Sequence, residues 1–162
     1  MVDPSLFKSG MRRLAAGVSL ITTLHEGQRH GLIATSVCSV STEPPSLLVC
    51  VNRSARSHAM IHAAGFFCVN LLASSDDATA RRFSDPHARD LRFEGRDWTT
   101  LLTGAPALVG ALASFDCEIA SAHRSGSHTI FVGNVVATEL RHDDISPLIY
   151  VDGRYATSAP RQ

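Results

Sequence analysis

The apolar residues of this chain are grouped into runs rich in Val, Ile, Leu and Phe, and short polar segments containing Gly or Pro separate the runs. Runs of this length predict β-strands, and the segments between them predict turns or loops. We expect strands at residues 18–23, 31–40, 46–51, 66–72, 111–121, 129–140 and 148–151. Because residues 113–119 alternate apolar with polar, Cys117 should lie on one face of its strand and Asp116 on the other.

A first helix is predicted near the start of the chain. Four apolar residues are spaced one, four and three positions apart, namely Leu6, Phe7, Met11 and Leu14. This spacing places them on one face of a helix that ends before Gly17. An apolar face of this kind is expected to pack against another surface.

Two further helices are predicted in the middle of the chain. One covers residues 57–64, with Ser57 as its N-terminal cap. The other covers residues 74–83, which open with small polar and acidic side chains that favour a helix start. Residues 85–104, rich in Asp, Arg and Gly, are expected to form an irregular loop that Trp98 anchors to the core.

Strands outnumber helices in this pattern and do not alternate with them, which argues against a doubly wound parallel sheet. No internal repeat is present. The pattern therefore predicts a mainly β architecture, antiparallel and barrel-like, with a few short peripheral helices. We expect one domain over residues 1–162, with a core at about 7–156, because a chain of this size buries about 70% of its unfolded surface.

The charge balance excludes one class of partner. Fifteen Lys and Arg residues match fifteen Asp and Glu residues, so the formal net charge is zero. Nucleic-acid-binding proteins usually carry a basic excess, so we expect no nucleic acid partner. Residues 1–10 show no apolar leader, and no window reaches eighteen consecutive apolar residues. We therefore predict no membrane association and a cytoplasmic location.

Four cysteines, Cys38, Cys50, Cys68 and Cys117, form no Cys-x-x-Cys pair. We interpret them as small buried thiols of a reducing compartment. Apolar strands disfavour thiolates, so a cysteine nucleophile is not expected. The chain also lacks a Gly-x-Ser-x-Gly elbow and a Gly-x-Gly-x-x-Gly fingerprint, which argues against a serine hydrolase of that type and against a Rossmann unit.

Three segments carry side chains that suit ligand binding. Residues 31–41 concentrate small and hydroxyl side chains, which fits either a flat ligand near the backbone or an ordinary solvated face. Residues 52–57 combine two arginines with hydroxyls at a helix start, which fits either a phosphate site or a solvated cap. His128 stands at a predicted hairpin, which fits either a ligand contact or a solvated loop residue.

His58 and His62 are four residues apart and would share a helix face, a spacing that can hold a metal. In a zinc peptidase helix, Glu follows the first His, whereas Ala59 stands here. No third ligand is evident in the sequence. We therefore expect no metal.

Eight short motifs follow one another along the chain. In order they are GVSLITT from Gly17, HGLIATSVCSVS from His30, EPP from Glu43, LVCVNRS from Leu48, FCVNLL from Phe67, SFDC from Ser114, GSH from Gly126 and PLIY from Pro147. This ordered series resembles the short-chain flavin reductases from about Phe7 to Tyr155. The similarity is strongest to the reductase components of two-component flavin-dependent monooxygenases, such as those acting on 4-hydroxyphenylacetate and chlorophenols.

The resemblance implies a split β-barrel of the FMN-binding type, assembled as a homodimer with flavin near the subunit interface. It also implies that NADH, or less often NADPH, reduces FMN or FAD, and that the reduced flavin passes to a separate monooxygenase. In such an enzyme the cofactors carry the hydride chemistry while the protein supplies stacking and orientation, so no side-chain nucleophile is needed.

The resemblance also assigns site residues. Those expected along the flavin ring or farther along the same segment are Ile33, Ala34, Thr35, Ser36, Val37, Ser39 and Ser41. Those expected at the ribityl and phosphate end are Asn52, Arg53, Ser54 and Ser57, and Phe83 is expected to close the flavin site. His128 is the expected catalytic residue at the nicotinamide, with Arg154 and Tyr155 near the same pocket. Ile33 replaces a frequent Thr, and Ser127 replaces a frequent Asp.

Two other functions are compatible with such a fold. One is a non-catalytic flavin-binding or flavin-storage protein, which reduction of the flavin by NADH would distinguish from an enzyme. The other is a split barrel that resembles the pyridoxamine-phosphate oxidases or haem binders. The Gly-Ser-His and Asn-Arg-Ser elements argue against this second possibility.

Overall fold

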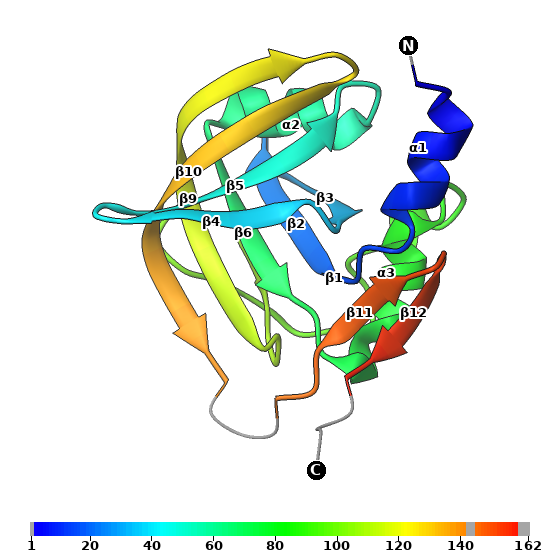
Figure 1. The fold of residues 1–162 in the computed structure, drawn as a ribbon. Helices are drawn as coiled ribbons and strands as arrows, with labels where there is room; N and C mark the ends of the chain where they lie inside the picture. The colour runs from blue at the N-terminus through cyan, green and yellow to red at the C-terminus, as the bar shows by residue number, and fades with distance from the viewer. Residues whose placement is uncertain (1, 142–144, 159–162) are drawn as a thin grey trace.

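The computed structural model describes residues 2–141 and 145–158 and contains one large sheet. Its strands are β2 (Ser19–His25), β3 (Gln28–Ala34), β4 (Val37–Thr42), β5 (Pro45–Asn52), β6 (Phe66–Leu71), β9 (Ala113–Ser125) and β10 (His128–Leu140). They pair in the order β3-β2-β6-β9-β10-β5-β4, and each pairing is antiparallel. Figure 1 shows this sheet strongly curved.

The curvature follows from how the two edges of the sheet are connected. The edge strands β3 and β4 are consecutive in the chain, and only Thr35 and Ser36 separate them. The sheet must therefore curl until its edges approach each other. Ser36 fastens this junction to β5, because its carbonyl accepts from the Cys50 amide at 3.1 Å and its hydroxyl donates to the Cys50 carbonyl at 3.1 Å. The predicted antiparallel split-barrel fold is confirmed.

The smaller elements surround this barrel. A second sheet joins β1 (Ala16–Gly17), β11 (Leu148–Val151) and β12 (Arg154–Thr157), and β7 (Trp98–Thr100) pairs with β8 (Pro106–Leu108). The helices are α1 (Pro4–Met11), α2 (Arg56–Ala64) and α3 (Asp77–Ser84), with 3-10 turns η1 (Ser74–Asp76) and η2 (Arg89–Leu91). In Figure 1, α2 covers one end of the barrel, while α1, α3 and the β11–β12 hairpin lie along one side.

The apolar core has two main parts. The part inside the barrel is fully buried and includes Ile21, Val49, Phe67, Val69 and Phe131. The second part lies between the sheet, α3, β8 and β11, and includes Leu20, Leu72, Phe83, Leu108 and Leu148. Because apolar side chains cover both of its faces, β2 is buried along most of its length, and α3 is held in a fixed position beside β3.

Some strand predictions were wrong. The predicted strand at residues 31–40 is broken at Thr35 and Ser36, because the chain crosses there from one edge of the sheet to the other. The predicted loop at residues 85–104 contains η2 and β7, although Trp98 does anchor it by packing against Phe83 and Phe93. The short strands β1, β8 and β12 were not predicted, because two to four residues give no readable periodicity.

Two helix predictions also need correction. Ser57 does not cap α2, since Ala55 occupies that position, and the buried Ser57 hydroxyl instead donates to the Gly31 carbonyl at 3.1 Å. Helix α1 ends at Met11, and among the described residues its predicted apolar face is left exposed, with Leu6 67% and Phe7 61% exposed. Among the described residues, no helix is long and apolar enough to cross a membrane.

The cysteines are all free, but they differ in burial. Cys38 is exposed, contrary to prediction, because β4 is an edge strand, and Cys50 is half-buried. Cys68 and Cys117 are buried as predicted. Burial and the neighbouring Asp116 raise the pKa of Cys117 to about 12, and the same two causes raise the pKa of Cys68 further. Neither buried thiol is a nucleophile at neutral pH.

Candidate functional site

A hollow of about 440 Å³, here called the central pocket, opens where β3 and β5 end and β10 begins. The antiparallel register places His128 opposite Asn52, so two residues far apart in sequence become neighbours. The end of β3 and the two residues after it supply the small side chains of Ala34, Thr35 and Ser36. The other residues that line the pocket are Leu32, Ile33, Cys50, Ala55, Phe83 and Ser84.

Phe83 forms a fixed wall of the central pocket. Its side chain is 2% exposed and makes an edge contact with Phe93, with ring centroids 5.2 Å apart. Gly31 lies directly behind it, and a Cβ at Gly31 would stand 2.6 Å from Phe83 Cε1. The absence of a side chain at Gly31 therefore allows the Phe83 ring to lie close against β3.

Neighbouring contacts orient His128. Its Nδ1 lies 2.9 Å from Ser127 Oγ, and the Ser127 carbonyl accepts from the Arg53 amide at 2.9 Å. The Asn52 carboxamide oxygen accepts from both the amide and the hydroxyl of Ser54 at 3.0 Å. The Ser127 hydroxyl thus contacts the imidazole of His128. The family that the chain resembles often has Asp at the position of Ser127. Within the described residues, Nε2 of His128 has no hydrogen-bond partner and can contact a ligand.

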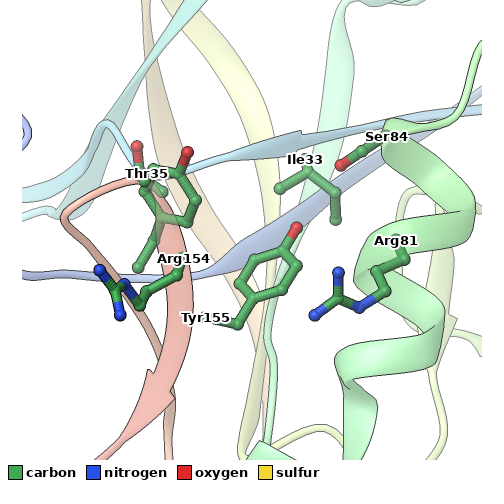
Figure 2. A pocket seen from close by; sticks show the side chains of 8 residues that line it. Ile33, Thr35, Arg81, Ser84, Arg154 and Tyr155 are labelled. Carbon is green, nitrogen blue, oxygen red and sulfur yellow. The ribbon is translucent and has the colours of Figure 1, made fainter.

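A second hollow of about 460 Å³, the tyrosine cleft, adjoins the central pocket through Ile33, Thr35 and Ser84. Figure 2 shows the Tyr155 ring in this cleft, with the Arg81 guanidinium directed toward it. The guanidinium carbon lies 5.2 Å from the ring centroid. The Arg154 guanidinium points away from Tyr155 in Figure 2 and pairs with Asp152 at 3.0 Å.

A third hollow of about 530 Å³, the basic bay, adjoins the central pocket on another side. The two share Leu32, Ala55, Phe83 and Ser84. The bay is lined by the cationic side chains Arg29, Arg56, Arg89 and Arg92, by His30, and by the acidic Asp90. Burial, and to a smaller extent Arg56 and His25, lower the pKa of His30. The bay is therefore positively charged through its arginines.

His58 and His62 share a face of α2, as their spacing predicted, and both contact the ring of Phe131. His58 Nε2 lies 2.8 Å from Thr129 Oγ1, and burial, with His62 and Arg53, lowers the pKa of His58. These contacts give His58 a packing role. Residues 2–141 and 145–158 contain no cluster of three or more His, Cys, Asp or Glu side chains suited to a metal.

The three hollows bring many of the predicted site residues together. The central pocket contains Ile33, Ala34, Thr35, Ser36, Asn52, Phe83 and His128, the tyrosine cleft contains Arg154 and Tyr155, and the basic bay contains Ser54 and Ser57. Four predicted residues line none of these hollows, namely Val37, Ser39, Ser41 and Arg53. Val37 packs against the barrel core, and Ser41 hydrogen-bonds to Glu43. Their contact with flavin stays a prediction.

Sequence reasoning singled out Arg56 in the segment 52–57 but missed the other three arginines of the basic bay. Arg89 and Arg92 belong to the segment interpreted as an irregular loop, and Arg29 stands in the first hairpin. One signal was available, because residues 81–96 contain five arginines. A cluster of this density indicates an anion site when the fold turns several of its members toward one hollow.

The family of flavin reductase like domains matches residues 11–159 of the chain. This chain is a member of that family. Among its relatives, the FMN reductase (NADH) RutF of Pantoea ananatis is 41% identical over 154 residues, which are 95% of this chain and 80% of the relative. The predicted family is confirmed.

Solved structures of other flavin reductases share the fold. A protein described as a flavin reductase from Haemophilus somnus has a TM-score of 0.93 at 36% identity, covering 97% of this chain and all of its own. An NADH:FAD oxidoreductase of Streptomyces globisporus, solved with NAD and FAD fragments, has a TM-score of 0.89 at 30% identity, covering 99% and 97%. The flavin reductase of styrene monooxygenase from Pseudomonas putida has a TM-score of 0.87 at 29% identity, covering 96% and 99%.

Proposed function

We propose that this flavin reductase uses NADH to reduce FMN or FAD in the central pocket. The observation that carries the proposal is the convergence of the β3 end, Asn52 and His128 on one hollow. The residues present fit a flat ring, because the β3 end offers small side chains and backbone groups, and Phe83 offers a smooth apolar wall. The adjoining basic bay fits a phosphate-bearing tail.

The bound nicotinamide and flavin supply the hydride chemistry themselves. The chain's task is to hold the two ligands in register and to exclude water. In this proposal, backbone groups of residues 33–36 and the Asn52 side chain orient the flavin, and Phe83 closes its apolar side. His128, oriented by Ser127, positions the nicotinamide.

We expect His128→Ala to raise the KM for NADH about fivefold, the loss that one hydrogen bond of ~1 kcal/mol implies. Flavin affinity should change less than twofold, because the flavin contacts stay in place. Steady-state kinetics with NADH and a separate flavin titration measure the two effects. His123→Ala serves as the control, since His123 is exposed on β9 and lines none of the three hollows. Unchanged NADH kinetics in His128→Ala would remove this role.

Stopped-flow mixing distinguishes the enzyme from a flavin-storage protein on the same fold. The enzyme bleaches oxidised flavin absorbance within seconds of mixing with NADH, whereas a storage protein retains the absorbance. The colour and mass of a cofactor released from the purified protein distinguish a flavin enzyme from a haem binder. Retained flavin absorbance in the presence of NADH, or bound haem, would overturn the proposed function.

The flavin reductase is proposed to pass reduced flavin to a separate flavin-dependent monooxygenase and to act as a homodimer in the cytoplasm. The free cysteines support a reducing compartment, which cell fractionation checks. The dimer is supported by the exposed apolar side chains Leu6, Phe7 and Met11 of α1 and Leu14 just after it. In analytical sedimentation the wild type should have twice the mass of one chain, whereas the Phe7→Asp variant should have the mass of one chain. A wild-type mass of one chain would exclude the dimer.

A further inference from the structure

The basic bay gathers arginines from separate parts of the fold. Arg29 comes from β3, Arg56 from the start of α2, and Arg89 and Arg92 from η2 and the residue after it. Among the described residues that line the bay, Asp90 is the one acidic residue. Four guanidinium groups therefore face one hollow with one opposing charge, an arrangement that attracts anions.

The positive charges in the bay disfavour one another. Burial, and next the charge of Arg89, lower the pKa of Arg92, while Asp85 acts in the opposite direction. Arg56 contributes to the lowered pKa of His30. Without an anion, this crowding costs free energy in the folded protein, because like charges at short range destabilise each other. An anionic ligand would remove that cost.

Arg92 is held in place by the backbone. Its Nη1 donates to the Gly31 carbonyl and its Nη2 donates to the Asp85 carbonyl, both at 3.3 Å. Its Nε is buried and has no hydrogen-bond partner among the described residues. An unsatisfied buried donor is uncommon and destabilises the folded protein. Arg92 is thus a cation held in a fixed position whose Nε is free to donate to a ligand in the bay.

The bay is larger than a single phosphate requires. Its volume of about 530 Å³ lies in the range of pockets that hold whole small molecules. The guanidinium carbon of Arg29 lies over the Phe93 ring, 4.8 Å from the centroid. Arg29 is exposed, so the opposite face of its planar guanidinium is accessible to a second ring. A planar cation on an aromatic ring is a platform on which a purine base stacks.

The bay adjoins the central pocket, at the side where the ribityl and phosphate chain of a flavin bound there would extend out of the pocket. Both hollows contain Phe83 and Ala55, and Ser54 lines the bay one residue before Ala55. The tyrosine cleft also adjoins the central pocket, and it contains Arg81 and Tyr155. Arg81 is already paired with Asp77 at 3.0 Å, so the cleft offers less uncompensated positive charge than the bay.

We propose that the basic bay binds the adenosine diphosphate end of FAD, with Arg89 and Arg92 at the phosphates and Arg29 against the adenine. Arg29 and Arg89 thereby make this chain favour FAD over FMN. The inference rests on the proposed function, because it takes the flavin ring to lie in the central pocket. It adds a specificity for the flavin dinucleotide that FMN reduction does not require.

Equilibrium titrations with FAD, FMN, riboflavin and ADP test the proposal, with quenching of flavin fluorescence and calorimetry for ADP. We expect Arg89→Ala and Arg29→Ala each to raise the Kd for FAD about tenfold and to change the Kd for riboflavin less than twofold. The Kd for FMN should change less than that for FAD. ADP should bind to the wild type and compete with FAD, and Arg89→Ala should weaken it. Asp90→Asn should tighten FAD, because it removes the opposing charge.

Arg13→Ala is the matched control, since Arg13 is exposed near α1 and lines none of the three hollows. Retained riboflavin binding shows that a variant is folded, and Arg89→Gln replaces Arg89→Ala if it is not. Unchanged FAD affinity, equal losses of affinity for FAD and FMN, or no binding of ADP to the wild type would each overturn the bay assignment while the reductase function stands. A wild type that neither binds flavin nor oxidises NADH in its presence would overturn both.

Discussion

We expect Asn70→Ala to lower the free energy of unfolding by about 4 kcal/mol, since at least two buried groups lose their partners at ~2 kcal/mol each. Asn70 is fully buried on β6. Its amide group donates to the Leu20 carbonyl at 3.1 Å and to Thr22 Oγ1 at 3.2 Å. Its oxygen accepts from the Leu108 amide at 2.8 Å and from the Ser114 hydroxyl at 2.9 Å. One side chain thus joins β6 to β2, β8 and β9.

Urea unfolding monitored by circular dichroism measures this loss. Asn134→Ala is a matched control, because Asn134 is half-buried on β10 and makes no side-chain hydrogen bond within the described part of the chain. The control should cost less than about 1 kcal/mol. A similarly small cost for Asn70→Ala would show that the four hydrogen bonds do not hold the strands together.

Gly31→Ala should weaken flavin binding by about fivefold to 150-fold, because overpacking of about 1–3 kcal/mol must be relieved beside the pocket. The added Cβ would lie 2.6 Å from Phe83 Cε1 and 3.3 Å from the Ile21 carbonyl oxygen. The strand backbone cannot yield easily, and Phe93 and Trp98 pack against the Phe83 ring. Phe83 must therefore move toward the central pocket, which it lines.

Flavin titration of Gly31→Ala, with thermal unfolding in parallel, tests this expectation. Gly10→Ala provides the control, since a Cβ at Gly10 meets nothing within 4 Å and alanine favours the helix. The double variant Gly31→Ala, Phe83→Leu should recover part of the lost affinity, because a smaller side chain relieves the clash. Wild-type flavin affinity in Gly31→Ala would show that Phe83 is not a fixed wall.

The proposed flavin site was predictable only in part. The motif order assigned residues 33–36, Asn52 and His128 to one site, and the structure places all of them on the central pocket. Ser39 and Ser41 were assigned by continuing the same strand, but the break after Ala34 carries them to the edge strand β4. A turn of two residues leaves the hydrophobic pattern unchanged, so periodicity alone does not reveal it.

The charges around the site were less predictable. Zero net charge excluded a basic surface, yet the fold turns Arg29, Arg56, Arg89 and Arg92 toward one hollow. These arginines come from segments up to 63 residues apart, and of the four only Arg56 lies in a segment that the sequence singled out. Composition averages over the whole chain, whereas binding depends on which few charges converge in space.

The sequence by itself determined the strand-rich, antiparallel character of the chain and its family, and its motifs named residues that line the central pocket. These features follow from local periodicity and from the order of short motifs, which need no knowledge of distant contacts. Only the tertiary structure decided that the sheet curls at Thr35 and Ser36 and that four arginines line one bay. It also decided that the Phe83 ring packs against Gly31, where a side chain would clash with it. Each of these depends on segments distant in sequence meeting in space, which a local pattern does not encode.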